Sequence, residues 1–212
     1  NLIIIISISV LFLMISCSSS CMEYRSATTA ARSEKNLERA EEWGIKALES
    51  PECSPATDAH APFFLATEVY LKQKKYTKMA EMLTIAEQRN SAQLLETPFK
   101  LGNTSVTTIG EGVEAYRDQE WVNIYNQAVE LIQDNKIDNA KEKIEIAILI
   151  HPQKGENYST MAAIYLENKD IDNALKEINR GLHADDTNSM LYQMEGDISS
   201  QNNDLEVAKI SY

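Results

Sequence analysis

A short phrase that returns every 34 residues constrains the fold of this chain more than any other feature. It occupies residues 136–140, 170–174 and 204–208. Each copy has an aliphatic residue second and an alanine fifth, so Ala140, Ala174 and Ala208 keep a constant step. A repeat of this length is typical of stacked antiparallel helix pairs, in which each pair covers the apolar face of its neighbour.

The helical pattern divides the rest of the chain around this array. We expect a signal peptide over 1–16, a lipidated polar tether over 17–26, and two divergent helix pairs over 27–89. A linker follows over 90–117, and the array, with its last repeat incomplete, fills 118–212. The linker is predicted as a long loop or extended excursion because Pro98, Gly102, Gly110 and Gly112 interrupt the helical pattern around the β-prone stretch 104–109. Loops of this length are uncommon unless they are functional or disordered.

The first sixteen residues carry no charged side chain, and their apolar run is broken only by Ser7 and Ser9. About 14 such residues are too few for a membrane-spanning helix, which needs roughly 20. They suit the apolar region of a secretory signal peptide. No initiator Met or basic segment precedes them, so we expect the given sequence to start a few residues late.

The apolar run ends in Leu-Met-Ile-Ser-Cys at 13–17, which resembles a bacterial lipobox. The resemblance implies cleavage after Ser16 and acylation of the Cys17 thiol. Cys21 is a rival acceptor that lacks the apolar position before it, and an uncleaved N-terminal anchor is the alternative. Ser18 follows the acceptor where Asp could stand, and in this the chain resembles lipoproteins of the outer membrane. The resemblance implies a lipid-anchored protein in the bacterial cell envelope, at the outer membrane and facing the periplasm.

The formal net charge of −12 argues against nucleic acid as a partner, because a polyanionic surface repels phosphates. Export to an oxidising compartment would permit Cys21 and Cys53 to pair. The sequence does not show whether the two lie close enough, and Cys21 falls in the predicted tether.

Small and bulky residues alternate at regular positions in the array. In the copy that starts at Trp121, and in the next, these positions hold Ile124, Ala128, Leu131, Ala140, Ile144 and Ala147, then Tyr158, Ala162, Tyr165, Ala174, Ile178 and Gly181. The pattern resembles the tetratricopeptide repeat (TPR) family. The resemblance implies an all-α fold, a right-handed superhelical array of antiparallel helix pairs. The small residues would let paired helices approach to within about 8–10 Å.

By analogy with the family, side chains of the first helices would line a concave groove. Tyr125 and Phe64 are the aromatic candidates for partner contacts, and ordinary packing between neighbouring pairs is the alternative interpretation. The groove residues that the resemblance implies are Phe64, Glu68, Leu71, Val122, Tyr125, Val129, Ser159, Ala163 and Leu166.

A search for catalytic chemistry gives no candidate. His60 opens a predicted helix, while His151 and His183 lie near helix ends, where a cation interacts well with the helix dipole. The sequence has no Cys-x-x-Cys, no nucleophile elbow and no phosphate-binding loop. We therefore expect neither an enzyme, nor a metal site, nor a cofactor.

These observations favour a non-catalytic scaffold, anchored in the membrane by lipid, that binds another envelope protein or a peptide segment of one. Two alternatives remain. The excursion near 97–112 could fold over a pocket in a small-ligand-binding lipoprotein of an uptake system, or the chain could be the N-terminal interaction part of a larger enzyme that continues past Tyr212. The sequence indicates no oligomeric state and no identity for the partner.

Overall fold

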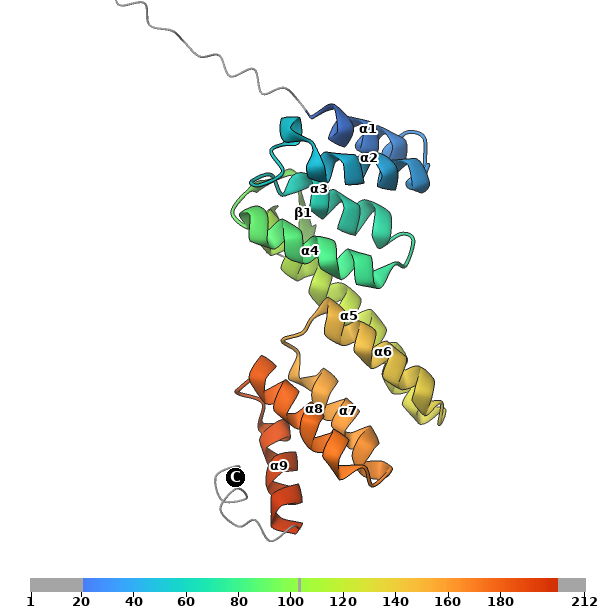
Figure 1. Cartoon of the computed structure of the whole chain (residues 1–212), viewed down its shortest axis with the longest axis vertical. Coiled ribbons are helices and arrows are strands. Elements are labelled where there is room, and N and C mark those ends of the chain that lie inside the picture. Colours follow the sequence, from blue (N-terminus) through green and yellow to red (C-terminus); the bar gives the residue numbers. More distant parts are fainter. Residues whose placement is uncertain (1–20, 103, 202–212) are drawn as a thin grey trace, which may run out of the picture.

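Helix hairpins stacked in chain order build the molecule. The computed structural model describes residues 21–102 and 104–201, and over these ranges the hairpins form an elongated body (Figure 1). Across the same ranges, no helix combines the length and the apolar character needed to cross a membrane. The hairpins are α1 (Met22–Arg32) with α2 (Leu37–Glu49), α3 (His60–Phe64) and its π-helical continuation η2 (Leu65–Tyr70) with α4 (Tyr76–Asn90), α5 (Ile109–Gln133) with α6 (Ile137–Ile150), and α7 (Gly155–Glu167) with α8 (Ile171–Ala184), followed by α9 (Ser189–Gln201).

The four hairpins share one type of turn. Each turn contains one residue in the left-handed region, and the second helix begins two residues later. In the last three hairpins, the N–H that follows the left-handed residue donates to the carbonyl five residues back, at 2.8–2.9 Å. The left-handed residues are Lys35, Lys74, Asn135 and Lys169, with φ between 54° and 59°. Because the turn recurs at these positions, the second helices of successive hairpins begin 39, 61 and 34 residues apart.

The alanines of the repeated phrase occupy equivalent places. Ala140 and Ala174 are each the fourth residue of their helix, α6 or α8, and neither is exposed to solvent. Ala208 lies outside the described residues. A Cβ on Gly181 of α8 would lie 2.5 Å from a methyl of Leu191, so α8 and α9 approach closely enough to exclude a side chain there. The prediction of an all-α array of helix pairs is confirmed.

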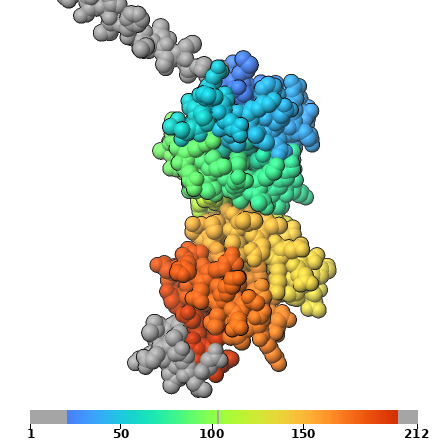
Figure 2. Space-filling view, viewed as in Figure 1, coloured from blue at the N-terminus to red at the C-terminus, as the bar shows by residue number. Residues whose placement is uncertain are grey.

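Two apolar cores lie one above the other. Among the described residues, the first joins α1–α4 to α5 as far as Ile124 and to the end of α6, around Leu65, Leu83 and Val113. The second joins the end of α5 to α6–α9, around Ile144 and Ile178. Figure 2 shows the two blocks, blue to green and yellow to orange, joined by a narrower region. The 25-residue helix α5 and its partner α6 both contribute side chains to both cores, so this hairpin holds the blocks together.

The predicted linker over 90–117 differs from the observed structure. Its middle is an antiparallel β-hairpin, β1 (Leu94–Leu101) and β2 (Thr104–Thr108), and α5 begins at Ile109. A capping box starts this helix: the Thr108 hydroxyl accepts from the Glu111 N–H, and the Glu111 carboxylate accepts from the Thr108 N–H. Because this cap directly follows the strand, the glycines at 110 and 112 lie inside the helix.

The predicted tether over 17–26 also ends earlier than expected. Helix α1 begins at Met22, because the Cys21 sulfur accepts from the Tyr24 N–H and acidic Glu23 lies in the first turn, where it favours the helix dipole. Residues 17–20 of the tether lie outside the described part.

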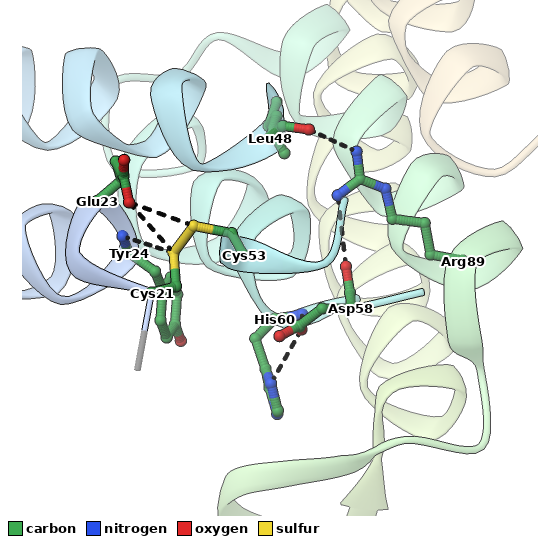
Figure 3. Close-up of a disulfide and its surroundings, with 8 residues drawn as sticks. All are labelled: Cys21, Glu23, Tyr24, Leu48, Cys53, Asp58, His60 and Arg89. Atoms are coloured by element: carbon green, nitrogen blue, oxygen red, sulfur yellow. Dashed lines mark hydrogen bonds and ion pairs between the residues drawn. A yellow bond between two sulfur atoms is a disulfide. The ribbon is translucent and has the colours of Figure 1, made fainter. Parts of the chain in front are cut away.

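Cys21 forms a disulfide with Cys53, which lies on the short 3-10 helix η1 (Pro51–Cys53) (Figure 3). Their Cα atoms are 4.6 Å apart, although 32 residues separate them in sequence. Near this bond, Arg89 of α4 donates to the carbonyls of Leu48 and Asp58, at 3.3 and 3.4 Å. The segment between α2 and α3 is thus fixed at two points, to α1 and to α4.

Candidate binding groove

A groove of about 820 Å³ opens between the C-terminal part of α5, the length of α7, and the start of α9. Its floor is largely apolar, with Ile132, Ile164 and Met194, and its walls carry short polar side chains. Exposed Met190, with 54% of its surface accessible, stands at the edge on α9. Unbranched methionine side chains adapt to different partners, so this edge suits contact with an apolar side chain.

Tyr125 is held rigidly in the groove wall. Its ring stacks on that of Trp121, with centroids 5.2 Å apart, and its hydroxyl lies 2.7 Å from the Thr160 hydroxyl on α7. The Trp121 indole N–H in turn donates to the Asn157 side chain at 2.8 Å, and the Lys154 ammonium lies over the indole ring. A side chain fixed by two neighbours, one of which is itself held in place, loses little entropy when a partner packs against it.

The charge around the groove is negative. Glu156, Glu167 and Asp185 line it, and among residues 21–102 and 104–201 no lysine or arginine does. Hydrogen bonds from Thr187 and Asn188 hold the pKa of Asp185 below its usual range and keep this carboxylate ionised. The groove therefore favours a segment that presents apolar side chains together with basic ones.

The structure brings some of the predicted groove residues together and separates others. Tyr125, Ser159 and Ala163 line the groove. Val122 is exposed (48%) on the same helix but is not part of the lining, Val129 is half-buried, and half-buried Leu166 packs on the second core. Tyr125 packs against its neighbours and also lines the groove, and its contact with a partner stays a prediction.

The family analogy also gives Ile132, Glu156 and Met190 as groove residues, and all three line it. Most of the third wall of the groove was missed. This wall consists of the α8–α9 loop and the first turns of α9. The family analogy considered only one face of each first helix, so it gave no signal for loop residues. The missed lining residues are Thr160, Ile164, Glu167, Asp185, Thr187, Asn188, Ser189 and Met194.

The predicted groove residues of the N-terminal block have different roles. Phe64 is 2% exposed and belongs to the first core, so it is no exposed anchor for a partner. One edge of Phe64 and the side chain of Glu68 border a separate cavity of about 330 Å³, across which strand β1 lies. Leu71 packs against the first core.

His151 has an environment that the sequence did not indicate. It caps the C-terminus of α6, 5% exposed, and its Nε2 lies 3.2 Å from Glu114 and 3.4 Å from Asp118, both on α5. These three ligand atoms lie within 4.8 Å of one another, a spacing that a metal ion could bridge. Lys154, whose Nζ is 2.7 Å from Asp118, already supplies a positive charge there. The arrangement is that of an ion-pair network between α5 and the α6–α7 turn.

His60 opens α3, as predicted, and takes part in a network that joins this helix to the β-hairpin. Its Nδ1 lies 3.1 Å from the Asp58 carboxylate and its Nε2 2.9 Å from the Leu94 carbonyl. The hydrogen bond to Asp58 raises the pKa of His60. Asp58 also accepts from the His60 backbone N–H at 2.7 Å. The Asp58 carboxylate therefore caps α3, because Ala59, the residue directly before the helix, has no side chain that could do so.

Comparison with known proteins adds little beyond the fold. No family model matches the sequence, and no curated protein matches it. Among solved structures, the crystal structure of MamA aligns over 87% of this chain and 89% of its own, at 12% identity and a TM-score of 0.38. This chain has a TPR-like helical repeat fold. That assignment rests on the shared turns and the equivalent buried alanines of this chain, and not on so distant a match.

Proposed function

We propose that this protein is a non-catalytic scaffold that binds a segment of a partner protein in the groove between α5, α7 and α9. The observation that carries the proposal is the groove itself, an apolar floor beside a rigid aromatic ring, with an acidic border. Helical repeat folds of this type generally work by binding and not by catalysis. The charge of the lining favours a segment in which basic residues flank apolar ones.

We propose further that the protein acts in the bacterial cell envelope, anchored through acylated Cys17, which lies outside the described residues. The disulfide supports export, since such bonds persist in oxidising compartments. It also bears on the choice of acceptor, because a Cys21 sulfur bonded to Cys53 is not free to take a lipid. Metabolic labelling with a radioactive fatty acid tests the anchor: Cys17→Ser should abolish the label, and a label that persists would contradict it.

The groove is tested by a charge placed at its edge. Met190→Glu adds a carboxylate to an exposed, apolar contact point, so it should not unfold the protein but should weaken partner binding. Leu149→Glu is the matched control, because Leu149 is exposed to a similar degree (49%) on α6 and does not line the groove.

The measurement uses a photo-reactive amino acid at position 159 of the groove, in cells, followed by mass spectrometry of the crosslinked product. We expect one envelope protein to crosslink in the unaltered chain and in Leu149→Glu, and its yield to fall about tenfold or more in Met190→Glu. Equal yields in the two variants would show that the groove is not the docking surface.

The two alternatives differ in what supports them. A small-ligand function is favoured by the cavity of about 330 Å³ that β1 helps to line. A place in a larger enzyme has no specific structural observation in its favour, and the reading frame beyond Tyr212 decides it directly.

A further inference from the structure

The cavity of the N-terminal block is lined by aromatic rings. It lies between α1, the α3–η2 helix, β1 and α5, whereas the groove lies in the C-terminal block. π-Helical turns such as η2, which contributes Glu68 and Thr67 to the lining, are frequent at functional sites. Five aromatic rings from these four elements take part: Tyr24, Phe63, Phe64, Phe99 and Tyr116.

The rings hold one another in fixed positions. Phe63 and Phe99 each pack against Tyr116 with centroids 5.8 Å apart, the first edge-on at 73°. Tyr24 packs edge-on against Phe64, also at 5.8 Å, with an interplanar angle of 88°. Edge-to-face packing is the favoured arrangement of aromatic pairs, so the walls of the cavity are preformed.

Two carboxylates, Glu68 and Glu96, and two basic side chains, Arg32 and His60, border the cavity. Glu68 also pairs with Lys72 at 2.8 Å. Glu96, on β1, accepts the Tyr24 hydroxyl at 2.9 Å, and Glu68, on η2, lies opposite. Burial and the neighbouring Glu96 raise the pKa of Tyr24, while burial followed by the charge of Glu68 raises that of Tyr116. Both tyrosines therefore stay neutral.

Arg32 shows which ligand chemistry this site accepts. The carbon of its guanidinium lies 6.0 Å from the centroid of the Phe64 ring, and its Nη2 lies 3.3 Å from Glu68. This side chain is half-exposed (49%), so it reaches into the site from the solvent side and is not locked there. A cation is thus already seated between an aromatic ring and a carboxylate.

We propose that this cavity binds a small organic cation of the ammonium or guanidinium class, which takes the place of Arg32 against Phe64 and Glu68. Aromatic faces and a nearby carboxylate are the usual means of recognising such cations. Once Arg32 is displaced, the two glutamates disfavour an anion, and a neutral ligand gains nothing from their charge. Because β1 supplies part of the lining, the hairpin that interrupts the helical array has a role as one wall of a ligand site.

The test compares a cation with its neutral isostere. We would titrate the full-length chain, purified in a non-ionic detergent, by isothermal calorimetry with choline, with agmatine, and with 3,3-dimethylbutan-1-ol, which has the shape of choline and no charge. We expect at least one of the two cations to bind, and the neutral alcohol to bind at least tenfold more weakly than choline or not at all.

Arg32→Gln gives the decisive variant, because removal of the competing internal cation should strengthen binding. Loss of one exposed ion pair and one weak cation–π contact corresponds to about a fivefold gain in affinity. Arg39→Gln is the matched control: it removes the same charge from α2, where Arg39 pairs with Glu34 outside the cavity. A general effect of net charge would move both variants equally.

Four results would overturn the proposal: no binding of either cation at millimolar concentration, equal binding of choline and the alcohol, equal affinity in Arg32→Gln and Arg39→Gln, or unchanged affinity in Glu68→Gln. Circular dichroism confirms that each variant is folded. Met190→Glu should leave cation binding intact, so failure of the groove hypothesis and failure of this one are distinguishable.

Discussion

Removal of the disulfide should destabilise the N-terminal block more than any surface substitution. The bond closes a loop with a sequence separation of 32 residues between α1 and η1, so it restricts the unfolded chain. The chain-entropy relation gives about 3.7 kcal/mol for a loop of this size. With a urea dependence of about 2 kcal/mol per molar, the unfolding midpoint should fall by about 1.8 M.

The assay is urea unfolding of the chain from Ser18 onward, in which Cys21 and Cys53 are the only cysteines. Tryptophan fluorescence follows Trp43 and Trp121, which both pack against the first core, and far-ultraviolet circular dichroism follows the whole array. We expect the first transition to shift in Cys21→Ser/Cys53→Ser, and in the unaltered protein after reduction. The double variant serves as its own control, because a reductant should leave its midpoint unchanged.

A small shift would refute this reasoning. If thiol titration shows full reduction and the midpoint moves by less than about 0.3 M, then the loop is held as firmly by Arg89 and the surrounding core as by the covalent bond. Free thiols at both positions in protein isolated from cells would instead show that the bond does not form there.

Three further predictions concern single residues. The pKa of His60 is raised above its ordinary value near 6.5 by Asp58, so its contribution to stability is complete below about pH 6.5 and is lost as pH rises through the raised pKa; unfolding midpoints measured between pH 5 and 9 should show this fall, and His60→Gln should flatten it. Gly181→Ala places a methyl against Leu191 and should destabilise the second core by about 1–3 kcal/mol in thermal unfolding; an unchanged melting temperature would mean that α9 moves freely away from α8. Thr108→Ala removes the hydroxyl of the α5 capping box and should cost about 1 kcal/mol, whereas Thr108→Ser should restore most of it.

The parts of the fold that depend on local sequence could be predicted. The turn and the buried alanine recur within a single hairpin, so a fixed step in the sequence reports them directly, at Ala140 and Ala174. The irregular offsets of the first two hairpins also follow from their turns, at Lys35 and Lys74.

Contacts between distant segments could not be predicted. Whether Cys21 meets Cys53 depends on the path of the segment after α2, and this path is fixed by Arg89 from another hairpin. The third wall of the groove and the placement of β1 beside Phe64 are likewise tertiary, so no periodicity reports them. The sequence therefore indicated a concave surface but misassigned its aromatic residues: only Tyr125 borders the groove, and Phe64 borders the cavity.

A single helix connects the two candidate sites. Tyr116 borders the cavity and Tyr125 borders the groove, nine residues apart on α5 and thus about 14 Å along its axis. Both ends of α5 are packed, one in each core, and its partner α6 also contributes to both cores. A ligand that binds the folded form at either site therefore stabilises the hairpin that both blocks share. A ligand at the cavity should therefore raise the unfolding temperature of the second block as well as the first, provided that α5 unfolds as one unit. If the two blocks unfold in separate transitions and the cation shifts only that of the N-terminal block, then α5 does not unfold as one unit. Its two halves would separate between the two tyrosines.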